Sequence, residues 1–213
     1  MTDTAVRSTD GSPPPPPALI PERRLGALLL TGGIIGLIAA TVLLVEKLEL
    51  LKNPDYIPTC NINPILSCGS VMNTPQAEAF GIPNPVIGIA GFAALAVVGA
   101  ALLAGGGFRP WFQAATQAGV TFAVIFVHWL IYQSLYVIGA LCPYCMIVWA
   151  VTIPVFWYTT LANLQPLLKT SPGWARRLTT TLTSYHGVIL TAWYLLIIVL
   201  ITQRFWDYWI TLI

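Results

Sequence analysis

Charged side chains are scarce in this sequence. Only 8% of the 213 residues are Asp, Glu, Lys or Arg, whereas 56% are apolar. An ordinary soluble domain carries roughly 25% charged residues, because its surface faces water. The formal net charge of +2 is too small to indicate a nucleic-acid-binding protein. The scarcity of charge therefore argues against a soluble protein and favours a single all-α, polytopic membrane domain.

Histidine is also rare, and internal repeats are absent. His128 falls in the middle of an apolar segment, where an interhelical hydrogen bond is the expected role and a proton relay is the alternative. His186 falls at the start of the last apolar segment, where we expect an interfacial position. Neither histidine lies near the cysteines in the sequence, which weakens the case for a zinc site.

Five apolar segments are long enough to cross a bilayer. They are residues 25–45, 83–104, 112–139, 142–164 and 186–203. In the first segment, Gly32, Gly33 and Gly36 are expected to let another helix approach closely. The stretch 71–80 is amphiphilic, and we expect it to form a short helix on the membrane surface.

These segments suggest three regions. Residues 1–22 form a polar, proline-rich tail, which we expect to be extended and cytoplasmic. Residues 23–164 hold the first four spans and form the expected catalytic domain, with a polar outer loop at 46–82. Residues 165–213 form an inner link and an accessory fifth transmembrane helix, followed by an interfacial cluster of Arg204 and aromatic residues.

The basic residues predict the orientation, because Lys and Arg gather on the cytoplasmic side of membrane proteins. With the N-terminus inside, seven basic residues fall on the inner side and three on the outer side. The inner residues are Arg7, Arg23, Arg24, Arg109, Lys169, Arg176 and Arg177, and the outer ones are Lys47, Lys52 and Arg204. We therefore expect a cytoplasmic N-terminus and an extracytoplasmic C-terminus. All four cysteines then lie on the extracytoplasmic face, where disulfides persist.

Two of the cysteines, Cys142 and Cys145, open the fourth apolar segment as a C-x-x-C pair. Exposed N–H groups and the helix dipole favour thiolates at a helix start, and Pro143 suits the first helical position. Cys142 is the expected target for an incoming thiol. Cys145 lies one turn deeper, within reach of a quinone dissolved in the membrane. A static disulfide is the alternative, because C-x-x-C alone is a weak signal.

The other two cysteines, Cys60 and Cys68, lie in the outer loop with seven residues between them. A structural disulfide that staples this loop is a common arrangement and is one alternative. Beside a second pair on the same face, we favour a shuttle, in which Cys60 accepts electrons from a partner and Cys68 relays them to Cys142. The spacing is poor for a zinc site of four cysteines, so we expect no metal.

Two further residues are candidates for binding a ligand near these thiols. Asn84 begins the second span, where its amide needs a hydrogen-bond partner and either caps the helix or binds a quinone carbonyl. Trp149 lies four residues after Cys145, on the same helical face. It either packs against other helices or walls a pocket for a flat ring.

The motifs together resemble the vitamin K epoxide reductase family, and the second cysteine pair resembles its bacterial branch. The resemblance covers roughly residues 25–164. It rests on Cys60-x7-Cys68, Ser67-Cys68-x-x-Val71, Phe80-Gly81-Ile82-Pro83-Asn84, and Cys142-Pro143-Tyr144-Cys145-Met146 with Val148-Trp149.

The resemblance implies a four-helix bundle around a quinone, menaquinone or ubiquinone, plus a fifth transmembrane helix. Bacterial members are similar in role to DsbB, which reoxidises a thioredoxin-like oxidase of exported proteins. Cys60 would then meet the partner, Cys68 would attack Cys142, and Cys145 would pass electrons to the quinone. Asn84 matches a polar contact to the quinone ring. Trp149 stands where animal members carry a tyrosine, which favours a quinone over vitamin K epoxide as substrate.

Many bacterial members continue into a fused thioredoxin-like domain, whereas this sequence stops at Ile213. We therefore expect a separate thioredoxin-like, DsbA-like partner on the extracytoplasmic side of a bacterial plasma membrane, the alternative being an extension that this sequence does not include. The expected activity is that of a disulfide-forming thiol:quinone oxidoreductase. The alternatives are reverse flow, in which a quinol reduces disulfides or the enzyme reduces vitamin K epoxide, and a non-enzymatic interaction protein with a stapled loop.

Overall fold

The computed structural model describes residues 20–167 and 173–211. Residues 1–19 of the predicted tail, and Lys169 in the predicted link, lie outside these ranges. The elements in chain order are α1 (Glu22–Lys52), α2 (Cys68–Met72), η1 (Pro75–Glu78), α3 (Asn84–Leu103), α4 (Pro110–Tyr132), η2 (Gln133–Ile138), α5 (Pro143–Leu167), α6 (Gly173–Ser184), α7 (His186–Arg204) and α8 (Trp206–Ile210).

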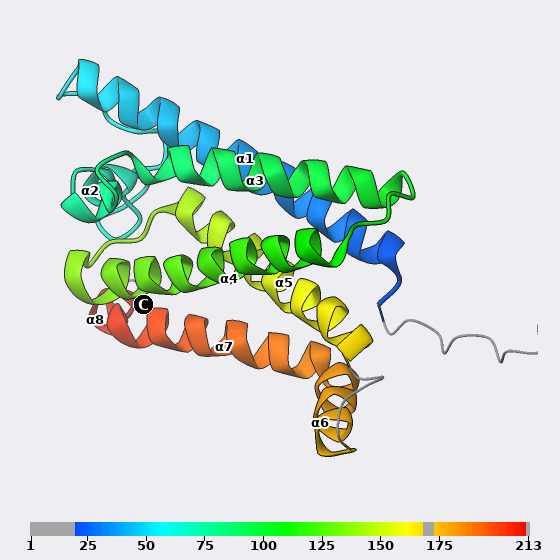
Figure 1. Cartoon of the computed structure of the whole chain (residues 1–213). Coiled ribbons are helices and arrows are strands. Elements are labelled where there is room, and N and C mark those ends of the chain that lie inside the picture. Colours follow the sequence, from blue (N-terminus) through cyan, green and yellow to red (C-terminus); the bar gives the residue numbers. More distant parts are fainter. Residues whose placement is uncertain (1–19, 168–172, 212–213) are drawn as a thin grey trace, which may run out of the picture.

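Five helical stretches in the described residues are long and apolar enough to cross a membrane. They are α1, α3, α4 with its continuation η2, the first part of α5, and α7. The all-helical, five-span prediction is thereby confirmed. Figure 1 shows these helices running side by side, with α2 at one end of the bundle. We call this end, which carries Cys60, Cys68 and Cys142, the cysteine end.

Glycines in α1 let α3 pack closely against it, as predicted. A Cβ atom added to Gly33 would lie 2.6 Å from the backbone nitrogen of Ala96, and one added to Gly36 would overlap the Phe92 ring. Gly32 faces a different neighbour, because its added Cβ would lie 3.1 Å from Val155 of α5. Small residues thus bring two helix backbones together where larger side chains would hold them apart.

Helix α1 is longer than its predicted span of 25–45. It continues to Lys52 because Glu46, Lys47 and the residues after them are good helix formers, although they end the apolar run. Glu46 and Lys47 are both buried. The last turns of α1 therefore carry two buried charges at the cysteine end.

The helix predicted at 71–80 is wrong in its bounds. The structure instead has α2, which begins at Cys68, and a separate 3-10 turn, η1, at Pro75–Glu78. Ser67 caps α2 by accepting a hydrogen bond from the Ser70 N–H. Thr74 is extended because Pro75 follows it, and this residue separates the two short helices.

The predicted inner link contains a helix that was not expected, α6. The last turns of the fifth span, α7, pack against the cysteine end. Arg204 was predicted to be interfacial. The residue is exposed, and its Nε donates a hydrogen bond of 2.7 Å to the Leu135 carbonyl in η2. Phe205 and Ile197 join a buried cluster with Leu135 and Leu141. The last helices therefore support the turn that leads to Cys142.

We expect Gly33→Ala to destabilise the folded protein by about 1–3 kcal/mol, because the added methyl group meets the α3 backbone. Thermal unfolding in detergent measures the change. Gly187→Ala is the matched control, since no atom lies within 4 Å of its added Cβ, and it should not lower the melting temperature. Equal effects of the two substitutions would contradict the close helix contact.

Candidate redox site

Three sulfur atoms meet at the cysteine end. Cys60 and Cys68 form a disulfide, and the Cys142 sulfur lies 3.1 Å from the Cys68 sulfur. Cys142 and Cys145 are free thiols. Cys68 and Cys142 are fully buried, whereas 4% of the Cys60 surface is exposed. The structure thus brings the two predicted pairs together, with Cys68 and Cys142 in contact.

Backbone hydrogen bonds set the register between the two cysteine-bearing segments. Leu66 and Leu141 form a parallel bridge, in which the Leu141 N–H donates to the Ile65 carbonyl over 2.7 Å. The Ser67 N–H donates to the Leu141 carbonyl over 2.9 Å. Because Cys68 follows Ser67 and Cys142 follows Leu141, this bridge places the two sulfur atoms next to each other.

Asn61 secures the turn between Cys60 and Cys68. Its Oδ1 accepts hydrogen bonds from the Gly69 N–H at 3.0 Å and from the Ser67 hydroxyl at 3.2 Å. The side chain therefore ties the residue after Cys60 to the residues on both sides of Cys68. This contact limits how far the loop can move without breaking hydrogen bonds.

Glu46 was not among the residues predicted for the site, but it holds the segment before Cys60. Its carboxylate accepts hydrogen bonds from the Tyr56 hydroxyl at 3.0 Å and from the Thr59 hydroxyl at 2.5 Å. The Thr59 N–H also donates to it. Thr59 immediately precedes Cys60, so the buried charge positions one end of the loop disulfide.

Lys47 holds the segment after Cys68, and it was not predicted either. Its Nζ donates to the Met72 carbonyl over 2.8 Å and pairs with the Glu78 carboxylate at 3.1 Å. Met72 ends the short helix that Cys68 begins. A sequence signal did exist, because two adjacent charges follow an apolar span, but such charges usually mark only the end of a span.

Cys142 immediately precedes the first residue of α5, Pro143, as the sequence indicated. The pKa of the Cys142 thiol is lowered from its ordinary value, mainly because the Cys145 side chain hydrogen-bonds to its sulfur. The backbone N–H groups of Cys145 and Tyr144 also favour the thiolate. These bonds outweigh the burial that raises the pKa, so Cys142 is suited to thiol exchange.

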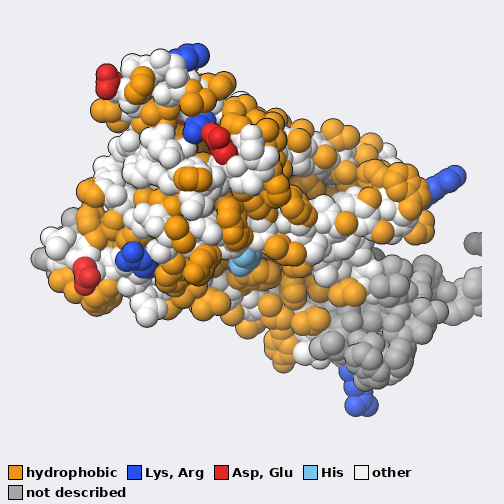
Figure 2. All heavy atoms as spheres, turned by 60° about the vertical axis from the view of Figure 1, so that its left-hand side comes forward, with side chains coloured by type: hydrophobic (Ala, Val, Ile, Leu, Met, Phe, Trp, Pro, Cys, Tyr) orange, Lys and Arg blue, Asp and Glu red, His pale blue; other side chains and the backbone are white. Residues whose placement is uncertain are grey.

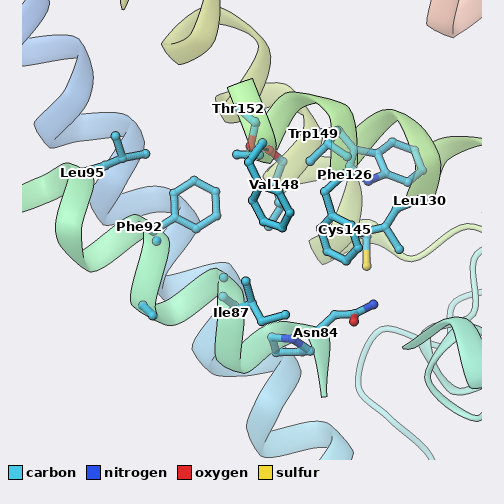
Figure 3. A pocket seen from close by; sticks show the side chains of 18 of the residues that line it. Asn84, Ile87, Phe92, Leu95, Phe126, Leu130, Cys145, Val148, Trp149 and Thr152 are labelled. Atoms are coloured by element: carbon cyan, nitrogen blue, oxygen red, sulfur yellow. Dashed lines mark hydrogen bonds between the residues drawn. The ribbon is translucent and has the colours of Figure 1, made fainter. Parts of the chain in front are cut away.

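A cavity of about 570 Å³ begins beside Cys145 and runs between α3, α4 and α5. Its walls are mostly apolar, and Cys145 and Asn84 are among the few polar side chains that line it. Figure 3 shows the Cys145 sulfur and the Asn84 amide pointing toward each other across this part of the cavity. The cavity therefore suits a lipid-soluble molecule with a polar ring at the cysteine end.

Asn84 lines the cavity but does not cap α3. Its Nδ2 donates to the Gln76 carbonyl over 2.8 Å, and its Oδ1 accepts from the Ala79 N–H at 3.1 Å. The side chain thus closes the loop around η1. An amide has two N–H groups and two acceptor lone pairs, so one of each is left for a ligand.

Trp149 forms part of the cavity wall, and 3% of its surface is exposed. Its indole N–H is buried without a hydrogen-bond partner in the described residues, as are the polar atoms of Trp157, Thr159 and Trp209. Of these four residues, Trp149 is the one that lines the cavity. A buried donor needs an acceptor, and a ring carbonyl of a quinone would supply one.

His128 forms the interhelical hydrogen bond that was expected of it. Its Nδ1 lies 2.7 Å from the Val124 carbonyl, and its Nε2 accepts from the Trp193 indole at 2.9 Å. Both ring nitrogens are thus engaged, and the residue is not on the cavity wall. These contacts favour the structural role over a proton relay.

The sulfur atoms of Cys60, Cys68 and Cys142 lie within 4.8 Å of one another, close enough to bind a metal ion. Two of them are joined in the disulfide, and a metal ligand has to be a thiolate. A metal would therefore need the loop pair to be reduced first. The arrangement as it stands is that of thiol–disulfide exchange.

Comparison with known proteins gives one family. The sequence model of the vitamin K epoxide reductase family matches residues 27–160, a stretch that includes all four cysteines, Asn84 and Trp149. No curated protein matches the chain. The matched region begins in α1 and ends within α5, so it covers the bundle around the cavity.

We expect Glu46→Ala to destabilise the protein by about 1–3 kcal/mol and to speed reduction of the loop disulfide by dithiothreitol, because Thr59 and Tyr56 lose their acceptor. Thermal unfolding and timed thiol alkylation measure the two effects. Glu49→Ala is the control on the same helix, since the Glu49 side chain is 43% exposed and its one ion pair in the described residues is with Lys52. Similar behaviour of the two variants would contradict the positioning role of Glu46.

A second prediction concerns the Cys142 pKa in a protein whose loop cysteines are both alanine. Cys145→Ala removes the largest cause of the lowered pKa, so the thiolate of Cys142 should appear only at higher pH. Ultraviolet absorbance of the thiolate against pH gives the midpoint, which is compared with the lower midpoint of the parent protein. A midpoint that stays or falls would show that Cys145 does not stabilise the thiolate.

Proposed function

The chain belongs to the vitamin K epoxide reductase family, and from this premise we propose that it is a disulfide-forming thiol:quinone oxidoreductase. The family and the five apolar helices make it a multi-pass membrane redox protein related to quinone and vitamin K reductases. Our proposal adds the direction of flow. Electrons pass from an extracytoplasmic thioredoxin-like dithiol protein to a quinone, in support of disulfide formation in exported proteins.

One observation carries this proposal: the contact of 3.1 Å between Cys68 and Cys142, with Cys145 on the cavity wall. The sulfur atoms thereby make a continuous route from the loop to the apolar cavity. A disulfide that merely stapled the loop would not need a free thiol against it. The contact therefore favours exchange over the non-enzymatic alternative.

The first step is attack on the loop disulfide. A thiolate of the partner attacks Cys60, the Cys60–Cys68 bond breaks, and Cys68 leaves as a thiolate. The second partner thiol then displaces Cys60, so the partner leaves as a disulfide. Cys60 and Cys68 now hold two electrons in the form of thiols.

The second step moves these electrons within the protein. The Cys68 thiolate attacks Cys142 of an oxidised Cys142–Cys145 pair, and Cys145 leaves as a thiolate beside the cavity. Cys60 then attacks Cys68, restores the loop disulfide and releases Cys142. The described state, with the loop pair oxidised and Cys142 and Cys145 reduced, matches the end of this step.

A bound quinone supplies the acceptor of two electrons and two protons that returns Cys142 and Cys145 to a disulfide. Its ring would lie beside Cys145, where the Trp149 indole and the remaining N–H of Asn84 would donate to its oxygens. The apolar walls of α3 and α4 suit an isoprenoid tail. Menaquinone and ubiquinone share these features, and both fit this proposal.

The purified protein should reduce a soluble quinone analogue with dithiothreitol as electron donor. Cys145→Ala should bring the rate down to the uncatalysed background, because the last thiol of the route is gone. Thr202→Ala, on the far helix α7, is the control and should retain the parent rate. A Cys145→Ala variant as fast as the parent protein would overturn the route. Product analysis with vitamin K epoxide tests reverse flow.

A further inference from the structure

The loop around Cys60 displays apolar side chains that neither the protein nor a membrane covers. Ile57 is 74% exposed and Ile62 is 67% exposed, and no large apolar side chain in the described residues is more exposed than Ile57. Other exposed apolar residues, such as Val97 and Ile125, lie on membrane-spanning helices, where lipid explains them. Ile57 and Ile62 lie outside those helices.

Lipid does not explain the exposure of these isoleucines. Ile57 follows exposed Asp55, and Ile62 follows exposed Asn61. Moving the loop into a bilayer would bury these polar groups at a high cost. Figure 2, which turns the cysteine end toward the viewer, shows few charged side chains there and many apolar ones between uncharged polar atoms. A protein surface is the cover that fits both the apolar and the polar residues of the loop.

The loop holds both isoleucines in place before any partner arrives. The Ile62 N–H donates to the Leu66 carbonyl over 2.9 Å, and the Asn61 N–H donates to the Pro58 carbonyl over 3.0 Å. Thr59 is bonded to the buried Glu46. A surface that is ordered in advance loses little conformational entropy on binding.

The position of Cys60 indicates which kind of partner covers the side chains of Ile57 and Ile62. Ile57 lies three residues before Cys60 and Ile62 lies two residues after it, so both are within about 11 Å along the chain. A specific protein contact covers roughly 800 Å² on each partner. A protein whose thiol reaches the Cys60 sulfur would therefore lie close enough to contact both isoleucines.

Approach of a partner thiol from the side of Ile57 and Ile62 also determines which sulfur atom is attacked and which one leaves. Cys68 is fully buried against Cys142, whereas Cys60 is buried with 4% of its surface exposed, so Cys60 is the more accessible sulfur of the loop disulfide for a protein thiol. Attack at Cys60 breaks the Cys60–Cys68 bond and makes Cys68 the leaving thiolate. That thiolate is formed beside Cys142, where the next exchange takes place.

We propose that Ile57 and Ile62 form the docking surface for the electron-donating partner, a soluble protein whose dithiol is surrounded by apolar residues. This inference rests on the proposed function and adds which surface recognises the donor. A small dithiol needs no such surface. The two isoleucines should therefore matter for a protein donor and not for a small one.

The test uses a protein in which Cys142 and Cys145 are both alanine, so the loop disulfide is its sole redox pair and no quinone is needed. Reduced thioredoxin is the protein donor and dithiothreitol is the small donor. Acid quenching and thiol alkylation give the second-order rate constant of loop reduction for each. The quinone assay is separate, so failure of the proposed function and failure of this inference are distinguishable.

The parent protein of this test is the one in which Cys142 and Cys145 are alanine. In it, reduced thioredoxin should reduce the loop disulfide faster than dithiothreitol does. Changing both isoleucines, Ile57→Ser with Ile62→Ser, should lower the thioredoxin rate about tenfold or more and change the dithiothreitol rate less than about twofold. Ile210→Ser, which removes another exposed apolar side chain at the cysteine end, should change neither rate. Three results would overturn the proposal: no advantage of thioredoxin in the parent, an unchanged thioredoxin rate in the double variant, or an equal loss with both donors.

Discussion

The contact between Cys68 and Cys142 is the constraint on which the rest of the site depends. Thiol exchange requires two sulfur atoms to meet, and here they belong to segments 74 residues apart. The Leu66–Leu141 bridge aligns these segments through backbone hydrogen bonds alone. Hydrogen bonds hold both segments of this contact. Glu46 and Lys47 on α1 hold the loop that carries Cys68, and Arg204 at the end of α7 holds the turn before Cys142.

The membrane explains why two of these supports, Glu46 and Lys47, are buried charges. A polar loop that caps an apolar bundle cannot gain much from hydrophobic packing, because most of its residues face water. Glu46 and Lys47 instead offer strong hydrogen-bond partners to a backbone that forms little regular structure. The same division appears at the cavity, where Asn84 lies opposite Cys145 and most of the other lining residues are apolar. The site thus lies between the loop disulfide at the cysteine end and an apolar pocket among the membrane-spanning helices.

Three features were predictable from the sequence: the role of the four cysteines as the candidate redox groups, the five spans, and the start of α5 at Pro143. Long apolar segments and the few charged residues between them mark the helices of a membrane protein. The glycines of α1 predicted a close helix contact because small residues let backbones approach, but they did not say that α3 is the helix in contact. The register of Leu66 with Leu141 was not, since backbone hydrogen bonds leave no mark in side-chain patterns. Arg204 was predicted only as an interfacial residue, and Glu46 and Lys47 only as part of the outer polar loop. The fold alone shows the carbonyl and hydroxyl groups that these three side chains bind.

The most direct measurement is disulfide formation between Cys68 and Cys142 in a protein that carries Cys60→Ala and Cys145→Ala. These two cysteines are then the only ones left, and mild oxidation followed by peptide mass spectrometry detects their bond. Our account predicts a linked Cys68–Cys142 peptide in most of the protein. Free thiols at both positions, under conditions in which Cys60 and Cys68 join in the protein lacking Cys142 and Cys145, would contradict it.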